Sequence, residues 1–217
     1  MNPDFLLLVP ILVMSVVVHE VAHAWQARRE GDPTADELGR ITLNPIPHLD
    51  PVGSLIVPIF LYLATEGMIF GWARPVPVNP ARFRSHPWGD VRVSLAGIVA
   101  NLLLALLCTL VAAGTAALGG TIPAGLAEVL QRGAFFGIFI NLLLAFFNLL
   151  PIPPLDGSHV LAQLLPARWR ARYAALGRIG IPLLLVLVFV VPGALRVALA
   201  PVFWLMGIAD AFVRLWI

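Results

Sequence analysis

Charged residues are scarce in this chain: they make up 12% of its 217 residues, whereas hydrophobic residues make up 59%. A soluble domain has about a quarter of its residues charged, so this composition excludes an ordinary soluble protein. The mean hydropathy of +0.90 is typical of an integral membrane protein. The length fits one compact helical bundle, and we expect residues 1–217 to form a single domain with no separate soluble part.

Cysteine and net charge are nearly absent as well. The single Cys108 lies in an apolar run and can form no intrachain disulfide, so we interpret it as a packing residue. The net charge of +2 is small, which argues against nucleic-acid binding. Residues 1–4 carry no basic region and no small-residue cleavage site follows the first apolar run, so a cleaved signal peptide is not expected.

Long apolar stretches are what the chain does contain. A membrane-spanning helix needs roughly 20 apolar residues. The candidate stretches are 5–27, 91–118, 133–150, 179–192 and 195–216. We therefore predict an all-α polytopic membrane protein with five to six membrane helices.

Basic residues indicate how these helices are oriented. Arginines cluster at positions 28–40, 74–92 and 168–178, and the positive-inside rule assigns these three segments to the cytoplasm. The connection 119–132 is then external, the N-terminus is outside and the C-terminus is cytoplasmic. Segment 52–71 lies between two cytoplasmic segments and is broken by glycine and proline, so we predict a re-entrant element, with a sixth span as the alternative.

Two segments outside the helices are expected to be extended on the cytoplasmic side. They are residues 39–45 and residues 71–80. Prolines at 75, 77 and 80 exclude a helix and a central strand, which leaves an edge strand or a polyproline-like run.

The chemistry is concentrated in the sequence His-Glu-Val-Ala-His at residues 19–23, within the first apolar stretch. On a helix, His19 and His23 point the same way and Glu20 lies close by, which is the arrangement of a zinc site with a general base. An ionisable cluster inside a membrane segment indicates a functional site. The alternative is a buried polar network that bridges helices.

A zinc site that supports catalysis has three protein ligands, so a third must come from elsewhere. With a rise of 1.5 Å per residue, His23 lies about 8 Å and His19 about 14 Å before Arg28 at the cytoplasmic end of the helix. Asp156 follows a proline-broken helix end at a similar depth, and it is our candidate for the third ligand. Its other reading is a turn residue before Gly157.

Taken together, these motifs resemble the site-2 proteases, which are intramembrane zinc metalloproteases of the M50 peptidase family. The matching segments are residues 19–23, 97–101, 148 and 155–157, and residues 42–45 and 71–79 look like the small bacterial branch without a PDZ or CBS domain. The resemblance covers about residues 5–160, which would form the catalytic core, with accessory helices at about 178–216. Ile98 stands where the family pattern often has proline, which affects a helix bend more than the chemistry.

The resemblance implies roles for individual residues. His19, His23 and Asp156 would bind one zinc ion per chain, and Glu20 would be the catalytic acid and base. Asn148 would position the substrate or stabilise an oxyanion, with helix capping as the alternative.

Other residues are weaker candidates for contacts with the substrate or a gate. Asn101 and His48 are two of them, although an interhelical hydrogen bond for Asn101 and a loop hydrogen bond for His48 are the simpler interpretations. His159 is a possible rival ligand. Val76 and Val78 lie in the extended stretch, which is a candidate edge for an unwound substrate to pair with.

The sequence thus predicts an intramembrane zinc metalloendopeptidase near the cytoplasmic side of the cell membrane. Zinc would activate water and Glu20 would move its proton during hydrolysis of a transmembrane or membrane-associated protein. The expected partners are this substrate and the lipid bilayer, with no nucleic acid; the oligomeric state is open. The alternative is a non-catalytic metal-binding membrane protein, either a transporter or a pseudoprotease that sequesters substrates.

Overall fold

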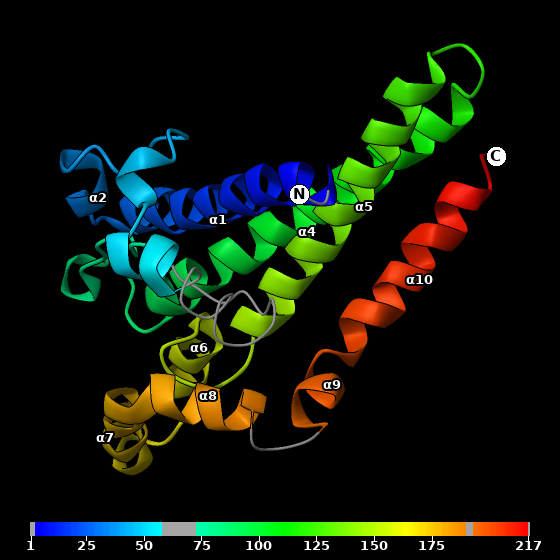
Figure 1. The fold of residues 1–217 in the computed structure, drawn as a ribbon. Coiled ribbons are helices and arrows are strands. Elements are labelled where there is room, and N and C mark those ends of the chain that lie inside the picture. The colour runs from blue at the N-terminus through cyan, green and yellow to red at the C-terminus, as the bar shows by residue number, and fades with distance from the viewer. Residues whose placement is uncertain (1–2, 58–72, 190–192, 217) are drawn as a thin grey trace.

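The computed structural model describes residues 3–57, 73–189 and 193–216, and the regular elements within these ranges are all helices. Three helices are long and apolar enough to cross a membrane: α1 (Pro3–Glu30), α4 (Trp88–Ala117) and α5 (Ala124–Asn148). They pack against one another and form the centre of the molecule (Figure 1). They coincide with the first three predicted spans.

Small residues let the long helices approach closely. The buried positions of α4 and α5 include Ala105, Ala112, Ala134 and Ala145. Side chains of this size allow close backbone contact between helices that lie in lipid. Large apolar side chains of α4, such as Leu103, are exposed instead, as expected of a surface that faces acyl chains.

The remaining elements are short. They are α2 (Thr34–Glu37), η1 (Ile46–His48), η2 (Pro51–Ile56), η3 (Pro80–Arg82), α6 (Asp156–Leu164), α7 (Ala167–Ala175), η4 (Leu176–Ile179), α8 (Gly180–Phe189), α9 (Ala194–Ala198) and α10 (Ala200–Arg214). The predicted span 179–192 corresponds to α8, whose continuation at 190–192 lies outside the described residues. The predicted span 195–216 is divided between α9 and α10.

The described residues contain no β-strand, so the predicted short extended strands are not formed there. Residues 73–79 are non-helical, but their backbone amides and carbonyls bond side chains, the carbonyl of His48 and the amide of Arg82 rather than another strand. Prolines 75 and 77 provide no N–H group for a ladder, which is the physical reason. The predicted re-entrant element begins near η2, and residues 58–72 lie outside the described residues.

The packing of α10 differs from the predicted topology. Val213 packs with Ala112, Ala113 and Ala134, which places the end of α10 against the half of α4 and α5 that leads to their connection (Figure 1). An ion pair of 3.3 Å between Asp4 and Arg132 brings the start of α1 toward the same end. The two chain ends, predicted on opposite sides of the membrane, therefore lie toward one end of the helix group.

Candidate metal centre

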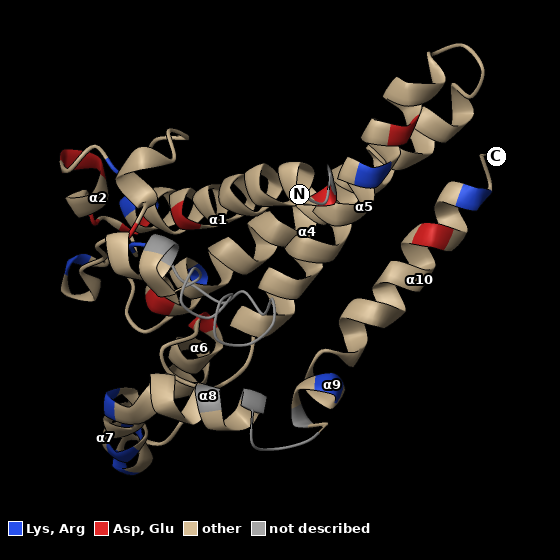
Figure 2. Ribbon diagram, in the orientation of Figure 1, with Lys and Arg blue, Asp and Glu red and all other residues tan. Residues whose placement is uncertain are grey.

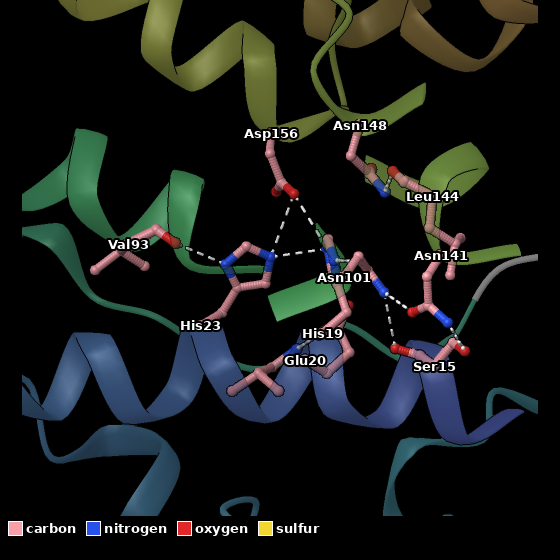
Figure 3. Close-up of polar contacts among 11 residues, drawn as sticks. Ser15, His19, Glu20, His23, Val93, Asn101, Asn141, Leu144, Asn148 and Asp156 are labelled. Carbon is pink, nitrogen blue, oxygen red and sulfur yellow. Dashed lines mark hydrogen bonds and ion pairs between the residues drawn. The ribbon is translucent and has the colours of Figure 1, made fainter. Parts of the chain in front are cut away.

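Three ligand-type side chains from distant parts of the chain converge at the opposite end (Figure 3). His19 and His23 lie one turn apart on α1, and Asp156 is the first residue of α6. Asp156 Oδ2 lies 3.1 Å from His19 Nε2 and 3.3 Å from His23 Nε2. The two Nε2 atoms are 3.0 Å apart. The three predicted ligands therefore meet in a small triangle of donor atoms.

The size of this triangle fits a zinc ion. Tetrahedral zinc with ligand bonds of about 2.0–2.1 Å holds neighbouring ligand atoms about 3.3 Å apart. The three observed distances lie close to that value, and Asp156 Oδ2 is buried without a hydrogen bond from any described residue. A cation would satisfy this oxygen, and a tetrahedral ion would keep its fourth corner for water or substrate.

Hydrogen bonds to the other ring nitrogens orient the two imidazoles. His19 Nδ1 donates to Asn101 Oδ1 at 2.6 Å, and His23 Nδ1 donates to the carbonyl oxygen of Val93 at 2.7 Å. In the neutral rings both Nε2 atoms then carry lone pairs, which point at one another and at Asp156. Such partners fix the tautomer that a metal-binding histidine needs.

A buried polar network extends this support across three helices. Asn101 Nδ2 donates to Asn141 Oδ1 at 2.8 Å and to the backbone oxygen of Ser15 at 3.3 Å. Asn141 Nδ2 donates in turn to Ser15 Oγ at 2.9 Å (Figure 3). The network explains why Asn101 is fully buried on α4 and why its side-chain oxygen remains available to His19.

Gly97 makes room for the imidazoles. A Cβ atom at this position of α4 would lie 2.5 Å from His23 Nε2 and 2.6 Å from His19 Cε1. No side chain fits there unless the rings move, so α4 can approach α1 only with glycine at this position.

Asp156 is held by contacts of its own short helix. A Cβ atom on Gly157 would lie 2.1 Å from the backbone oxygen of Leu149, so glycine allows α6 to start directly against the end of α5. Further along α6, Gln163 Nε2 donates to Asp90 Oδ2 on α4 at 2.6 Å. The carboxylate is therefore fixed relative to both long helices.

Glu20 is in contact with the non-helical segment 73–79. Its Oε2 accepts a hydrogen bond of 2.8 Å from the amide of Val76. Arg40 holds the preceding carbonyls, because its Nη2 donates to Arg74 at 2.9 Å and to Pro75 at 3.4 Å. Burial and the charge of Arg74 lower the pKa of Arg40, while the negative charge of Glu20 acts in the opposite direction.

The far end of this segment is fastened to the residues after α1. Asp32 Oδ2 accepts a hydrogen bond of 2.6 Å from the amide of Asn79, and the other oxygen accepts bonds from Thr34. Burial raises the pKa of Asp32, but these hydrogen bonds to the charged carboxylate outweigh it and leave the pKa below its ordinary value. Segment 73–79 is thus fixed along α1 at Glu20 and again beyond its end.

A cavity of about 540 Å³ opens between the triangle and this segment. Its lining includes His19, Glu20, His23, Val76, Val78, Asn148, Asp156 and His159. Asn148 Nδ2 donates to the carbonyl of Leu144 at 3.0 Å, the hydrogen bond of a helix end. His159 is exposed and lies outside the triangle.

His48 is the last residue of η1 and does not line this cavity. It is fully buried, and its Nε2 donates to the carbonyl of Thr42 at 3.0 Å, which is the loop hydrogen bond considered as its alternative role. Its backbone oxygen accepts from the amide of Arg74 at 2.9 Å, so it supports the non-helical segment. A role as a gate stays a prediction.

Ser15, Asn141 and Arg40 also belong to the site, although the sequence does not predict them there. Ser15 lies four residues before His19, and Asn141 lies seven before Asn148, so each shares a helix face with a predicted residue. That spacing, with polar side chains in apolar segments, was an available signal. Arg40 gives no such signal in the sequence, because its hydrogen-bond partners lie 34 and 35 residues away in a proline-rich stretch.

Comparisons with known proteins give relatives that carry the same kind of name. A relative from Bacillus subtilis (strain 168), named "Putative zinc metalloprotease YwhC", is 42% identical over 187 residues, covering 85% of this chain and 80% of the relative. A relative named "Putative zinc metalloprotease Rip2" from Mycolicibacterium smegmatis is 33% identical, covering 92% of this chain and 73% of the relative. Rip2 from Mycobacterium tuberculosis (strain H37Rv) is 32% identical, with coverage of 97% and 77%. No solved structure matches.

Together the site and the relatives define the class, which is that of membrane zinc metalloproteases. The family model for "Peptidase family M50" matches residues 115–191, a range that contains Asn148 and Asp156 but not the two histidines. The chain belongs to peptidase family M50, the site-2 protease family.

Proposed function

We propose that this protein is an intramembrane zinc metalloendopeptidase that cleaves transmembrane or membrane-associated proteins. The observation that carries the proposal is the triangle formed by His19, His23 and Asp156, at a cavity between helices of membrane-spanning length. We propose one zinc ion per chain, because these residues form one group of three ligands.

The chain's own groups supply the remaining chemistry. A zinc ion held by the three ligands would supply Lewis acidity toward a peptide carbonyl and water. Glu20 takes the proton of the attacking water and delivers it to the leaving amine. The amide of Val76 orients its carboxylate through a single oxygen, Oε2. Asn148, in the same cavity, positions the substrate carbonyl or stabilises the charge that develops on its oxygen.

The substrate must be extended where it is cut, because a helix hides its carbonyl groups in internal hydrogen bonds. Within the described residues, Val78 N–H and the carbonyl of Val76 have no hydrogen-bond partner, although both residues line the cavity. We propose that an unwound substrate pairs with this part of segment 73–79 by strand addition. The gate would be the predicted re-entrant element 52–71, of which residues 58–71 lie outside the described residues.

We place the protein in the cell membrane, with the end that holds the triangle toward the cytoplasm. Support comes from the arginines of segments 28–40, 74–92 and 168–178, which gather at that end (Figure 2). The N-terminus would then be outside. The packing of α10 supports a C-terminus on the outer side as well, whereas the sequence predicts a cytoplasmic one.

The deciding experiment compares wild type with Glu20→Gln for zinc content and for cleavage of a single-span test substrate in proteoliposomes. We expect Glu20→Gln to retain zinc and to lose cleavage by about 10²-fold or more, the usual contribution of a general base. Glu128→Gln is the matched control, since it makes the same change on an exposed carboxylate that pairs with Arg132 on the surface of α5. Equal cleavage by wild type and Glu20→Gln would reject the proposal and favour a non-catalytic metal-binding protein.

A further inference from the structure

The C-terminal part of the chain carries arginines without acidic neighbours. No aspartate or glutamate occurs between Asp156 and Asp210, and this stretch contains five arginines. All five are exposed and form no ion pair with any described residue, and three of them, Arg168, Arg172 and Arg178, lie on α7 or directly after it without a hydrogen bond to any described residue. Figure 2 shows basic residues on α7 and no acidic residue on that helix. This local positive charge is uncompensated within the described protein.

The two faces of α7 have different partners. Arg170 Nε donates to the carbonyl of Ala162 at 3.0 Å, and Tyr173 Oη donates to the carbonyl of Pro151 at 2.8 Å. These residues attach the helix to α6 and to the loop before it. Arg168 and Arg172, four residues apart, share another face and point away from these contacts.

The outer face also carries groups suited to a membrane surface. Trp169 is 47% exposed, and the guanidinium Cζ of Arg172 lies 5.3 Å from the centroid of its ring. Exposed Leu176 and Ile179 follow, and the apolar helix α8 begins directly after them. Tryptophan and arginine next to an apolar helix are typical of the headgroup level, and basic clusters there attract anionic lipids.

We propose that Arg168, Arg172 and Arg178 bind the phosphate groups of anionic lipids and so hold α7 at the membrane surface. An acidic protein segment has the same charge, but the exposed tryptophan and the adjoining apolar helix favour lipid. Each arginine near an anionic surface contributes roughly fivefold to the association.

This lipid contact is connected to the metal centre. Tyr173 holds Pro151 at the start of the proline-rich loop, and Arg170 holds the last turn of α6, whose first residue is Asp156. A Cβ atom on Gly180 would lie 2.1 Å from the carbonyl oxygen of Pro153, so the start of α8 rests directly on the same loop. Anchoring α7 therefore stabilises the position of Asp156. This part of the inference rests on the proposed proteolytic function.

The lipid preference is tested without any cleavage assay. The full-length protein is reconstituted in phosphatidylcholine with spin-labelled phosphatidylglycerol or spin-labelled phosphatidylcholine, and the immobilised fraction of each is measured. We expect wild type and R168K/R172K to prefer phosphatidylglycerol and R168Q/R172Q to lose most of that preference. The control R132Q/R214Q removes the same charge from two arginines that are paired with carboxylates on α5 and α10, and it should keep the preference. Equal preference in wild type and R168Q/R172Q would overturn the lipid site.

The connection to the metal centre is tested by cleavage in the same vesicles. Phosphatidylglycerol should raise the cleavage rate of wild type, and Tyr173→Phe should lose this rise while it keeps the lipid preference. A cleavage defect of R168Q/R172Q that is equal in both lipids, and limited to substrates with acidic flanks, would show that the arginines bind substrate instead. If no variant cleaves in any lipid, the proposed function fails while the lipid measurement still stands.

Discussion

Gly97 shows how a single residue determines whether the metal centre can form. Its backbone lies against both imidazoles, and an added Cβ atom would overlap His23 Nε2 and His19 Cε1. The two rings are already held by hydrogen bonds to Asn101 and Val93 of the same helix, one turn to either side of Gly97, so they have little freedom to move away. The position therefore tolerates no side chain without a loss of ligand geometry.

We predict that Gly97→Ala lowers zinc affinity by about 10- to 100-fold, the usual effect of disturbing the groups that orient metal ligands. Zinc per chain after dialysis against a graded chelator measures this directly. Gly114→Ala is the matched control, because it lies on the same helix and its Cβ would meet nothing within 4 Å. Equal zinc retention by the two variants would contradict the assigned packing.

At this scale the sequence predicts the ligands but not all of their supports. His19 and His23 are predictable because a spacing of four places them on one helix face, and Asp156 because a proline-broken helix end returns to the same depth. The hydrogen-bond partner of His19 is not predictable from the sequence, because Asn101 is equally suited to hold two helices together. In the structure it does both, and only the packing of three helices reveals this.

Segment 73–79 is neither a helix nor a strand, although it borders the cavity of the candidate metal centre. The prolines correctly exclude a helix, but the sequence leaves open whether the segment forms an edge strand or a polyproline-like run. That depends on the partners of its backbone, which are Glu20, Arg40 and Asp32. Because the separations of these side chains from the segment range from 34 to 56 residues, no local pattern predicts them.

We predict that Val78→Pro reduces cleavage several-fold while zinc stays bound, since it removes the one amide that the segment can offer to a substrate near Glu20. Initial rates at several substrate concentrations, with zinc content measured in parallel, would show the effect mainly as a raised KM. Val78→Ala keeps the amide and reports the loss of side-chain packing alone. If Val78→Pro and Val78→Ala have the same rates, strand addition at this position is wrong.

For the whole molecule, the course of α10 determines where the chain ends. The three long helices are predictable from apolar length. The side of the membrane on which the C-terminus lies is not predictable in this way, because the distribution of arginines does not decide whether the short helix α8 crosses the membrane. The packing of Val213 against the far end of α4 makes α10 run in the same direction as α4.

We therefore predict that the C-terminus and the α4–α5 connection are accessible from the same side of the membrane. Single cysteines at Thr121, Leu215 and Ala167, in a Cys108→Ser background, can be labelled with a membrane-impermeant maleimide in intact cells and in inverted vesicles. Positions 121 and 215 should label together and position 167 from the opposite side. If positions 215 and 167 label from the same side, the C-terminus is cytoplasmic, as the sequence predicts, and our placement of α10 is wrong.

The network of Ser15, Asn101 and Asn141 has a consequence for how the protein is made. Each residue comes from a different long helix, and each amide finds its full set of partners only when all three helices have met. A pair of these helices alone would leave polar groups facing lipid, which is costly. The bilayer itself thus disfavours half-assembled intermediates, so that a chain acquires its metal ligands and its folded core in one cooperative step.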